Sequence, residues 1–361
     1  MDAAGLGTGT GHGSRHYVPV LKLKQGEKRA LALVQPAFAA LVTPLLEVVE
    51  LIGAEPLATH LDRAFNKLDP AVEGLGRYFL DPRELAPMGE AAAQDVFTRA
   101  DALGKPFTPV VGISRAVGVQ AALQAAGVGV AIRLVREEFE APGLGLRLMR
   151  FLADHALQIA HVDLLVDLGG VDLMVRSGVA DMARAFLDDI PHMAAWRSVT
   201  LLASAYPKRP DVERHSHALV DRVEWQAWRD ILFPARGTLS RLPAFGDCAI
   251  QHPDGVEGFD PKTMRVSAII RYATKDHWLL VKGEATDVVV PSLQFPKLAD
   301  RLTSPPLAAH FDGEMHCIGC AAIVRAAAGA PRLGSATVWR CLGTVHHITK
   351  TVEELDGLAW P

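Results

Sequence analysis

Five charged residues stand at or near the ends of short hydrophobic runs, namely Lys22, Glu47, Arg133, Asp167 and Asp247. Lysine and arginine bind phosphate or carboxylate groups, and arginine does so with a two-pronged fork of N–H donors. Carboxylates hold divalent cations or exchange protons as general acid and base. If these side chains meet, they predict a site for a phosphorylated or nucleotide-like ligand, with a divalent metal as a candidate cofactor.

The full candidate site is larger and divides by side-chain chemistry. The residues expected to supply acid or base groups, or to hold a metal, are Glu47, Asp167, Asp247 and His252. The residues expected to contact an anionic ligand are Lys22, Lys24, Arg133, Tyr206, Arg271 and His346. Asp81 and Arg115 also follow hydrophobic runs, but they receive no role. The alternative is that such charges form structural ion pairs, for instance Lys22 with Glu47 and Arg133 with Asp167.

Histidine and cysteine side chains concentrate near the C-terminal end of the sequence. They are His310, His316, Cys317, Cys320, Cys341, His346 and His347. Cys317 and Cys320 have the two-residue gap of a zinc knuckle, which makes them candidate metal ligands, although a second such pair is absent. Cys341 lies in a predicted strand, where a free cysteine is usually a small buried side chain. We expect His346 and His347 in extended chain, where neighbouring side chains point in opposite directions.

Eight hydrophobic runs with the character of β-strands must position most of these residues. They are Tyr17–Lys22, Leu45–Leu51, Arg77–Leu80, Thr108–Ile113, Gly129–Leu134, Asp163–Asp167, Val199–Ser204 and Phe245–Ile250. Most are separated by stretches long enough for a helix, and strands that alternate with helices pair in parallel. Eight such units close into a (β/α)8 barrel. The sequence therefore predicts an α/β protein with a TIM-barrel-like fold, whose polar strand ends meet at one mouth.

Helical patterns fill the intervals between the predicted strands. They cover Lys28–Leu41, Ala58–Leu68, Gly89–Leu103, Val117–Ala126, Gly143–Ile159, Val179–Ile190 and Asp221–Leu232. Pro36 predicts a kink or break in the first of them. After Pro253 the rhythm changes. The expected elements there are a hairpin of Met264–Arg271 and Trp278–Val281, a helix at Gln294–Leu302 and a strand at Ala336–Leu342.

These patterns divide the chain of 361 residues into three parts. Residues 1–16 form a glycine-rich stretch that we expect to be a flexible leader. Residues 17–253 form the barrel, and residues 254–361 a mixed α/β extension or cap at its C-terminal side. The order of the elements does not decide whether this extension is a separate domain.

Composition limits the classes of function. The net charge is 37 − 41 = −4, so no overall positive field favours nucleic acid. Four cysteines are too few for a disulfide scaffold of this size, which favours a reduced, cytoplasmic setting. No apolar run is long enough for a membrane span, and the N-terminus lacks a signal-peptide core. The motifs of P-loop ATPases and of serine hydrolases with a nucleophile elbow are absent.

Several short phrases resemble the Beta protein family of the phage T4 type, and they occur in the family's order. The first are Tyr17-Val-Pro-Val-Leu-Lys-Leu-Lys24, Gly26-Glu27 and Pro44-Leu-Leu-Glu47. The middle ones are Val223-Glu224-Trp225, Phe245-Gly246-Asp247, Gln251-His252-Pro253 and Ile270-Arg271-Tyr272. The last are Thr337-Val-Trp339-Arg340, Gly343-Thr344 and His346-His347-Ile348. The resemblance implies a setting of phages and bacteria, and it implies no particular reaction.

Two functional hypotheses follow from the sequence. The first is an enzyme that binds or cleaves a phosphorylated or nucleotide-like ligand at the barrel mouth during phage–bacterium conflict, in its most concrete form a metal-dependent phosphodiesterase. The second is a non-enzymatic interaction or sensor protein that uses the barrel as a scaffold and binds a protein partner. An enzyme needs its charged groups together in one open site, whereas a scaffold has them paired with one another.

Overall fold

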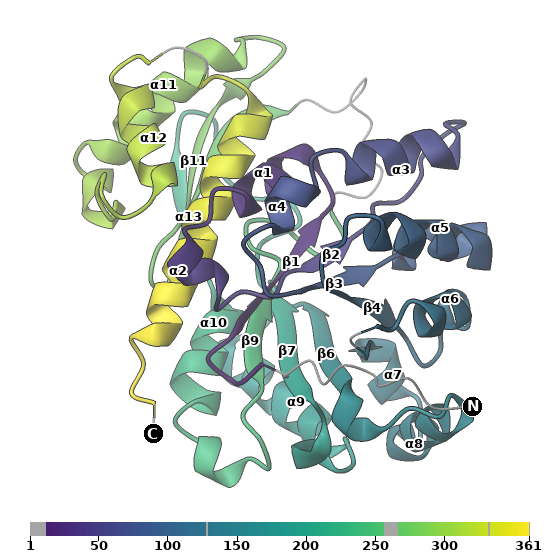
Figure 1. The fold of residues 1–361 in the computed structure, drawn as a ribbon. Coiled ribbons are helices and arrows are strands. Elements are labelled where there is room, and N and C mark those ends of the chain that lie inside the picture. Colours follow the sequence, from purple (N-terminus) through teal and green to yellow (C-terminus); the bar gives the residue numbers. More distant parts are fainter. Residues whose placement is uncertain (1–11, 128, 256–265, 331–332, 361) are drawn as a thin grey trace.

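The computed structural model describes residues 12–127, 129–255, 266–330 and 333–360 and contains a closed barrel of eight parallel strands (Figure 1). The strands are β1 (Tyr17–Lys22), β2 (Leu45–Glu47), β3 (Tyr78–Asp81), β4 (Phe107–Val111), β5 (Val130–Val135), β6 (Val162–Gly170), β7 (Ser198–Ser204) and β9 (Ala244–Asp247). The ring closes because β9 pairs with both β7 and β1. Each of the eight predicted runs contributes one strand, so the predicted TIM-barrel-like fold is confirmed.

Helices surround the barrel on the outside. They are α1 (Gln25–Leu31), α2 (Pro36–Ala39), α3 (Leu57–Phe65), α4 (Asp69–Val72), α5 (Glu90–Asp101), α6 (Val119–Gln124), α7 (Arg136–Glu140), α8 (Leu144–Asp154), α9 (Arg176–Asp188) and α10 (Val223–Ala227). The break predicted at Pro36 is confirmed, because α1 ends at Leu31 and α2 begins at the proline itself. Proline is tolerated at a helix start because its missing N–H has no partner there in any case.

The interior of the barrel is filled by one small apolar cluster. Its members are Val18, Val20, Leu45, Phe79, Val110, Ala131, Leu165, Leu202 and Cys248. The alternate residues of the same strands, such as Tyr17, Leu46 and Leu164, pack against the surrounding helices in a much larger cluster. Because successive strand residues point to opposite faces, the residue two positions after an interior residue also points inward. This rule decides which charged side chains reach the mouth.

A polar cluster lies at the opposite, amino-terminal end of the barrel. Asp163 is completely buried, and its carboxylate binds Arg77 and Arg197, with N–O distances of 2.6 Å to each. His12 is buried beside this pair, with its Nε2 3.0 Å from Thr200 Oγ1. His12, which belongs to the predicted leader, thus contacts the barrel. Residues 1–11 lie outside the described residues.

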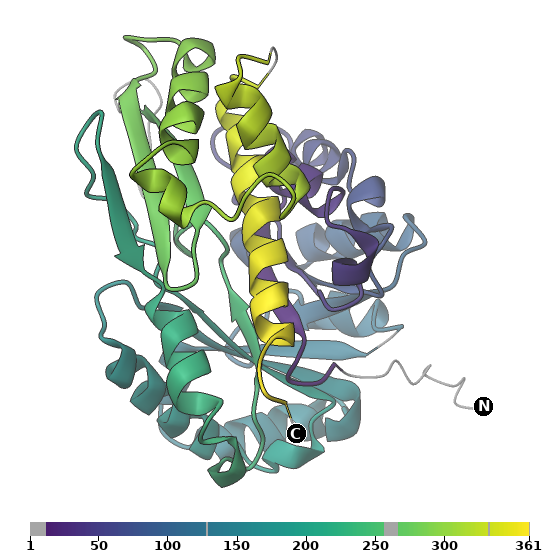
Figure 2. The ribbon, with the colours of Figure 1, turned by 90° about the vertical axis from the view of Figure 1, so that its left-hand side faces the viewer.

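A second layer stands beside the barrel (Figures 1 and 2). Its sheet has the antiparallel order β10 (Ser267–Ala273), β11 (His277–Ala285) and β8 (His217–Asp221). Its helices are α11 (Pro291–Thr303), α12 (Ile318–Ala327) and α13 (Ala336–Asp356). The predicted hairpin and the predicted helix at Gln294–Leu302 are confirmed as β10, β11 and α11, although residues 264 and 265 of the hairpin lie outside the described residues. Strand β8 was not predicted.

The predicted strand at Ala336–Leu342 is wrong, because these residues begin the long helix α13. Ser335 caps this helix, with its hydroxyl accepting a hydrogen bond from the backbone N–H of Val338. Helix α13 contacts α1 and β1 of the barrel and also α12 and β10 of the second layer. Among the described residues, no helix combines the length and the apolar character that a membrane crossing requires.

Candidate functional site at the barrel mouth

Five charged side chains point into the barrel at the carboxyl ends of its strands. Lys22, Glu47, Asp81, Arg133 and Asp167 each stand two residues after a member of the interior apolar cluster, on five different strands. The pleat therefore places them one level above that cluster, around a common axis. Four of the five were predicted for this site, and Asp81 joins them from the residues that had no assigned role.

Arg133 lies at the centre of this group and binds all three carboxylates. Its Nη1 is 2.6 Å from Glu47 Oε1 and 3.0 Å from Asp81 Oδ2. Its Nε and Nη2 are 2.8 Å and 2.6 Å from Asp167 Oδ2. The guanidinium is almost completely buried, as are Glu47 and Asp81. A buried charge is tolerated when it is paired and hydrogen-bonded in this way.

Two further cations flank the centre and are more accessible. Lys22 Nζ is 2.5 Å from Glu47 Oε2, and the lysine side chain is 15% exposed. Arg115 Nη1 is 2.7 Å from Asp81 Oδ1, its Nη2 donates to the carbonyl of Val110, and its side chain is 21% exposed. Both ion pairs named as the structural alternative, Lys22 with Glu47 and Arg133 with Asp167, are present.

These cations keep the carboxyl groups ionised. Burial alone raises the pKa of Glu47, but Arg133 and Lys22 outweigh it and lower this pKa to about 2. The pKa of Asp81 is also below its ordinary value. Burial raises it, but the nearby cations Arg115 and Arg133 lower it by more. The carboxylates in turn raise the pKa of Arg133 against the effect of its burial. At neutral pH, Glu47 and Asp81 are therefore carboxylates and cannot donate protons.

Hydrogen bonds occupy all the carboxylate oxygens of the cluster. Glu47 uses one oxygen for Arg133 and the other for Lys22. Asp81 accepts from Arg133 with one oxygen, and from Arg115 and the backbone N–H of Arg83 with the other. Asp167 accepts from Arg133 and from the backbone N–H of Gly169. Lysine has three N–H donors and arginine five, so Lys22 and Arg115 retain donors without an acceptor among the described residues.

The remaining candidates near the mouth form contacts at its rim. Arg271, in β10, donates through Nε to the hydroxyl of Tyr206, which follows β7, at 2.7 Å. His252 is buried, with its Nε2 3.6 Å from Asp172 Oδ1 and its Nδ1 accepting from the backbone N–H of Asp254. Lys24 lies immediately before α1 with its side chain largely exposed, and partial desolvation of its amino group, together with nearby Arg340, lowers its pKa.

Asp247 does not join the mouth, which corrects the expected placement. It stands two residues after Phe245, which packs in the outer cluster, so its side chain points away from the barrel interior. Its Oδ2 is 2.8 Å from Nε2 of His347 in α13, and its Oδ1 accepts from the hydroxyl of Tyr17. All three side chains are completely buried. The group joins α13 to the barrel and lies outside the candidate site.

His346 and the two candidate metal-ligand cysteines also lie away from the mouth, in the second layer. Cys317 precedes α12, Cys320 lies in its first turn, and His346 is buried in the middle of α13. The expected extended chain at His346 and His347 is wrong. The two rings still diverge, because neighbouring residues of a helix are about 100° apart around its axis. His347 faces the barrel, and His346 faces the cysteines.

A scan against protein-family models matches residues 17–353 to the family described as Beta protein. The match covers both the barrel and the second layer, from β1 to within the last turns of α13. A search of curated proteins found no match.

Proposed function

This chain belongs to the Beta protein family, and we propose that its barrel mouth binds an anionic ligand that carries a phosphate group. One observation carries the proposal. The carboxylate oxygens of the mouth are all engaged in hydrogen bonds, whereas the cations Lys22 and Arg115 retain unused N–H donors and are partly exposed. A site with spare donors and occupied acceptors is complementary to a negative group.

The charge balance supports an anion over a metal ion. The negative charges of the three carboxylates are balanced by the positive charges of three cations, Lys22, Arg115 and Arg133. A divalent cation at the carboxylates would stand beside three positive side chains and compete with their hydrogen bonds. A phosphate group would instead accept hydrogen bonds from Lys22 and Arg115, which are partly exposed and are each held in place by a carboxylate partner.

The same contacts favour binding over metal-assisted cleavage. Glu47 and Asp81 have pKa values below their ordinary range, so neither donates a proton at neutral pH. His252 is the candidate proton carrier at the rim, since an imidazole ring can both accept and donate a proton. Turnover of a bound ligand would therefore depend on His252 and would not require Asp247, which lies outside the mouth.

A sensor function is the second candidate, and the contact between Arg271 and Tyr206 favours it. This hydrogen bond joins β10 of the second layer to the end of β7 at the barrel rim. A ligand that draws Arg271 toward the mouth would change this contact and so alter the second layer. A role in conflict between phages and bacteria is proposed from the family resemblance alone.

The test is a thermal-shift and calorimetric titration with inorganic phosphate, pyrophosphate, sugar phosphates and nucleotides. A ligand at about 100 times its dissociation constant adds about 2.7 kcal/mol to the free energy of unfolding. For a chain of this size we expect the unfolding midpoint to rise by a few degrees. The double variant Lys22→Met/Arg115→Met should lose this rise. Arg115→Lys, which keeps the charge without the fork, should retain part of it.

Arg150→Met is the matched control, because Arg150 lies on the outside of α8 and its side chain is 79% exposed. It removes the same kind of charge far from the mouth and should leave the rise intact. An equal rise in the double variant would place the anion elsewhere. The absence of any rise with the whole series of phosphates would reject the proposal. Once a binding ligand is found, the variant His252→Ala should still bind it but should no longer turn it over.

A further inference from the structure

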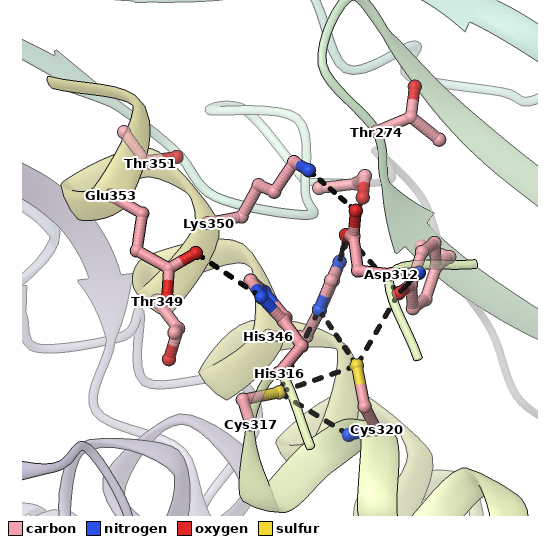
Figure 3. A network of polar contacts seen from close by, with 12 residues as sticks. Thr274, Asp312, His316, Cys317, Cys320, His346, Thr349, Lys350, Thr351 and Glu353 are labelled. Atoms are coloured by element: carbon pink, nitrogen blue, oxygen red, sulfur yellow. Dashed lines mark hydrogen bonds and ion pairs between the residues drawn. The ribbon is translucent and has the colours of Figure 1, made fainter. Parts of the chain in front are cut away.

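Two cysteines and two histidines meet between the helices of the second layer (Figure 3). Cys317 and Cys320 come from the start of α12, His346 from the middle of α13, and His316 directly precedes Cys317. Cys317, Cys320 and His346 are buried, and the His316 side chain is 9% exposed. None of these four residues takes part in the barrel mouth, so this site is independent of the ligand proposed there.

The ligand atoms of Cys317, Cys320 and His346 have the spacing of one face of a coordination tetrahedron. The sulfurs of Cys317 and Cys320 are 3.6 Å apart, and His346 Nδ1 is 3.8 Å from the first and 3.3 Å from the second. Bond lengths of about 2.3 Å to sulfur and about 2.0 Å to nitrogen imply edges of about 3.8 Å between sulfurs and about 3.5 Å between sulfur and nitrogen. The fourth candidate, His316, has a ligand atom within 4.8 Å of those of Cys317 and His346.

We propose that Cys317, Cys320, His316 and His346 bind a structural zinc ion that fastens α12 to α13. Two thiolates and two imidazoles form one of the ligand sets that zinc takes in closed, four-coordinate sites. The sulfur ligands disfavour calcium and magnesium, which prefer oxygen. The backbone N–H of Cys320 also points at the sulfur of Cys317, at 3.3 Å, and stabilises negative charge on it.

Hydrogen bonds on the far side of each imidazole leave one nitrogen for the metal. His346 Nε2 is 2.8 Å from the carbonyl oxygen of Ala273, so it carries the proton and Nδ1 presents its lone pair toward the sulfurs. His316 Nδ1 is 3.2 Å from a carboxylate oxygen of Glu353, which leaves Nε2. Carbonyl and carboxylate partners of this kind typically fix metal-binding histidines.

The Nε2 atom of His316 gives an independent indication of a ligand. It is buried and has no hydrogen-bond partner among the described residues. A buried polar atom without a partner costs free energy, and coordination of a metal would remove that cost. The alternative of a disulfide leaves this nitrogen unexplained, and the sulfurs are 3.6 Å apart, compared with about 2.05 Å in a disulfide.

The decisive measurement is the metal content of the native full-length protein, purified under reducing conditions without a metal-affinity step. Elemental analysis should find about one zinc ion per chain. After removal of the zinc with a chelator, added Co²⁺ should produce the intense absorption bands of tetrahedral cobalt with thiolate ligands. A protein that contains no zinc and takes up no Co²⁺, with all its thiols reduced, would overturn the proposal. So would a mass that is lower by the two hydrogens of a Cys317–Cys320 disulfide.

Variants assign the ligands. Cys317→Ala should lose the zinc, whereas Cys341→Ala should keep it, because Cys341 is buried in the same helix as His346 but packs in the barrel-side cluster. Glu353→Gln, which keeps all four ligands, should bind zinc roughly 10- to 100-fold more weakly. Equal zinc in Cys317→Ala and Cys341→Ala would overturn the assignment. If Cys317→Ala does not fold, the native metal content and Glu353→Gln still decide.

Discussion

Arg133 is enclosed by three carboxylates that would repel one another without it. Glu47, Asp81 and Asp167 all contact its guanidinium within 3.0 Å. Removing one member of a buried ion pair is far more costly than removing an exposed one, because the remaining charge stays buried and unpaired. Arg133 is therefore a positioning residue. It holds the carboxylates that neutralise Lys22 and Arg115, and these two cations would contact the ligand.

Arg133→Met should lower the free energy of unfolding by about 3–5 kcal/mol at neutral pH. The wild-type protein gains stability from Glu47 because its pKa is about 2 when folded, compared with an ordinary value of 4.5. That gain is fully present above the ordinary value and is lost as the pH falls from 4.5 toward 2. The variant lacks the main cation responsible, so it should lose less stability in acid. Urea unfolding at neutral pH and at about pH 3 measures both effects.

Arg150→Met serves as the control, since it removes an exposed arginine from α8 and should change stability by less than about 0.5 kcal/mol. Equal destabilisation of Arg133→Met at both pH values would contradict the expected link with the carboxylates. A stable Arg133→Met protein at neutral pH would show that the three carboxylates are not held by this arginine.

At the scale of residues, the sequence identified charged side chains at the strand ends, but the apolar residues on both faces of the barrel strands hid which of these side chains point inward. Glu47 and Arg133 each follow an interior residue by two positions, and they reach the mouth as expected. Asp247 does not, because β9 is apolar on both faces and its sequence does not reveal which residues point inward. A shift of one residue exchanges the two faces of a strand. The contact between Asp247 and His347 was also beyond reach, since it joins residues 100 positions apart.

Helix α13 is the element to which the sequence analysis gave the wrong type, a strand at Ala336–Leu342. A surface helix shows one apolar stripe, but α13 is buried on several sides because it lies between the barrel and the second layer. Its first turns contain Val338 and Trp339, which favour strands, and this local preference led to the wrong prediction. The barrel helices α3, α5 and α8 each have one buried face. The bounds of α3 and α5 were predicted within a few residues, whereas for α8 the start was predicted correctly to one residue and the end five residues too late.

Gly343 shows how closely α13 packs. A β-carbon at this position would lie 2.7 Å from the carbonyl oxygen of Arg271 in β10 and 2.9 Å from Ile250 Cδ1. Alanine favours helix formation over glycine by about 1 kcal/mol, but the contact with backbone cannot relax without moving the helix. Gly343→Ala should therefore destabilise the protein by about 1–3 kcal/mol. Urea unfolding monitored by circular dichroism provides the value.

Gly145→Ala in α8 is the matched control, because its β-carbon would meet the nearest atom at 3.6 Å, an ordinary contact. This variant should be neutral or stabilised by about 0.4–1 kcal/mol, since alanine restricts the unfolded chain. If both variants were stabilised equally, the close approach of α13 to β10 would not exist in solution.

At the scale of the whole molecule, the barrel and the second layer are interleaved along the sequence. Strand β8 lies between β7 and β9 in the sequence, yet it pairs with β11 of the second layer. Arg222, which follows β8 and is completely buried, donates to the carbonyl oxygen of Thr274 and to the hydroxyl of Thr351. The sequence order alone places β8 within the barrel crossover, so this exchange between the two layers could not be predicted from periodicity.

A chain that ends at residue 253 keeps all eight barrel strands, but we expect it not to fold cooperatively. It loses the partner strand of β8, the acceptors of Arg222 and the imidazole of His347 that binds Asp247. Arg222 and Asp247 thereby lose their partners, and each unpaired polar group that stays buried costs about 1–3 kcal/mol, more when it is charged. Together they are comparable to the whole free energy of unfolding of a typical domain, about 5–15 kcal/mol.

The fragment should therefore be aggregated or lack near-ultraviolet circular dichroism, whereas the full chain unfolds in a sharp transition. Supplying residues 254–361 as a separate chain during refolding should recover part of the native signal, because α13 restores the partners of Asp247 and Arg222. A monomeric fragment that unfolds cooperatively on its own would show instead that the barrel is an independent domain. The contacts between α13 and the barrel would then serve only to dock the second layer beside the mouth.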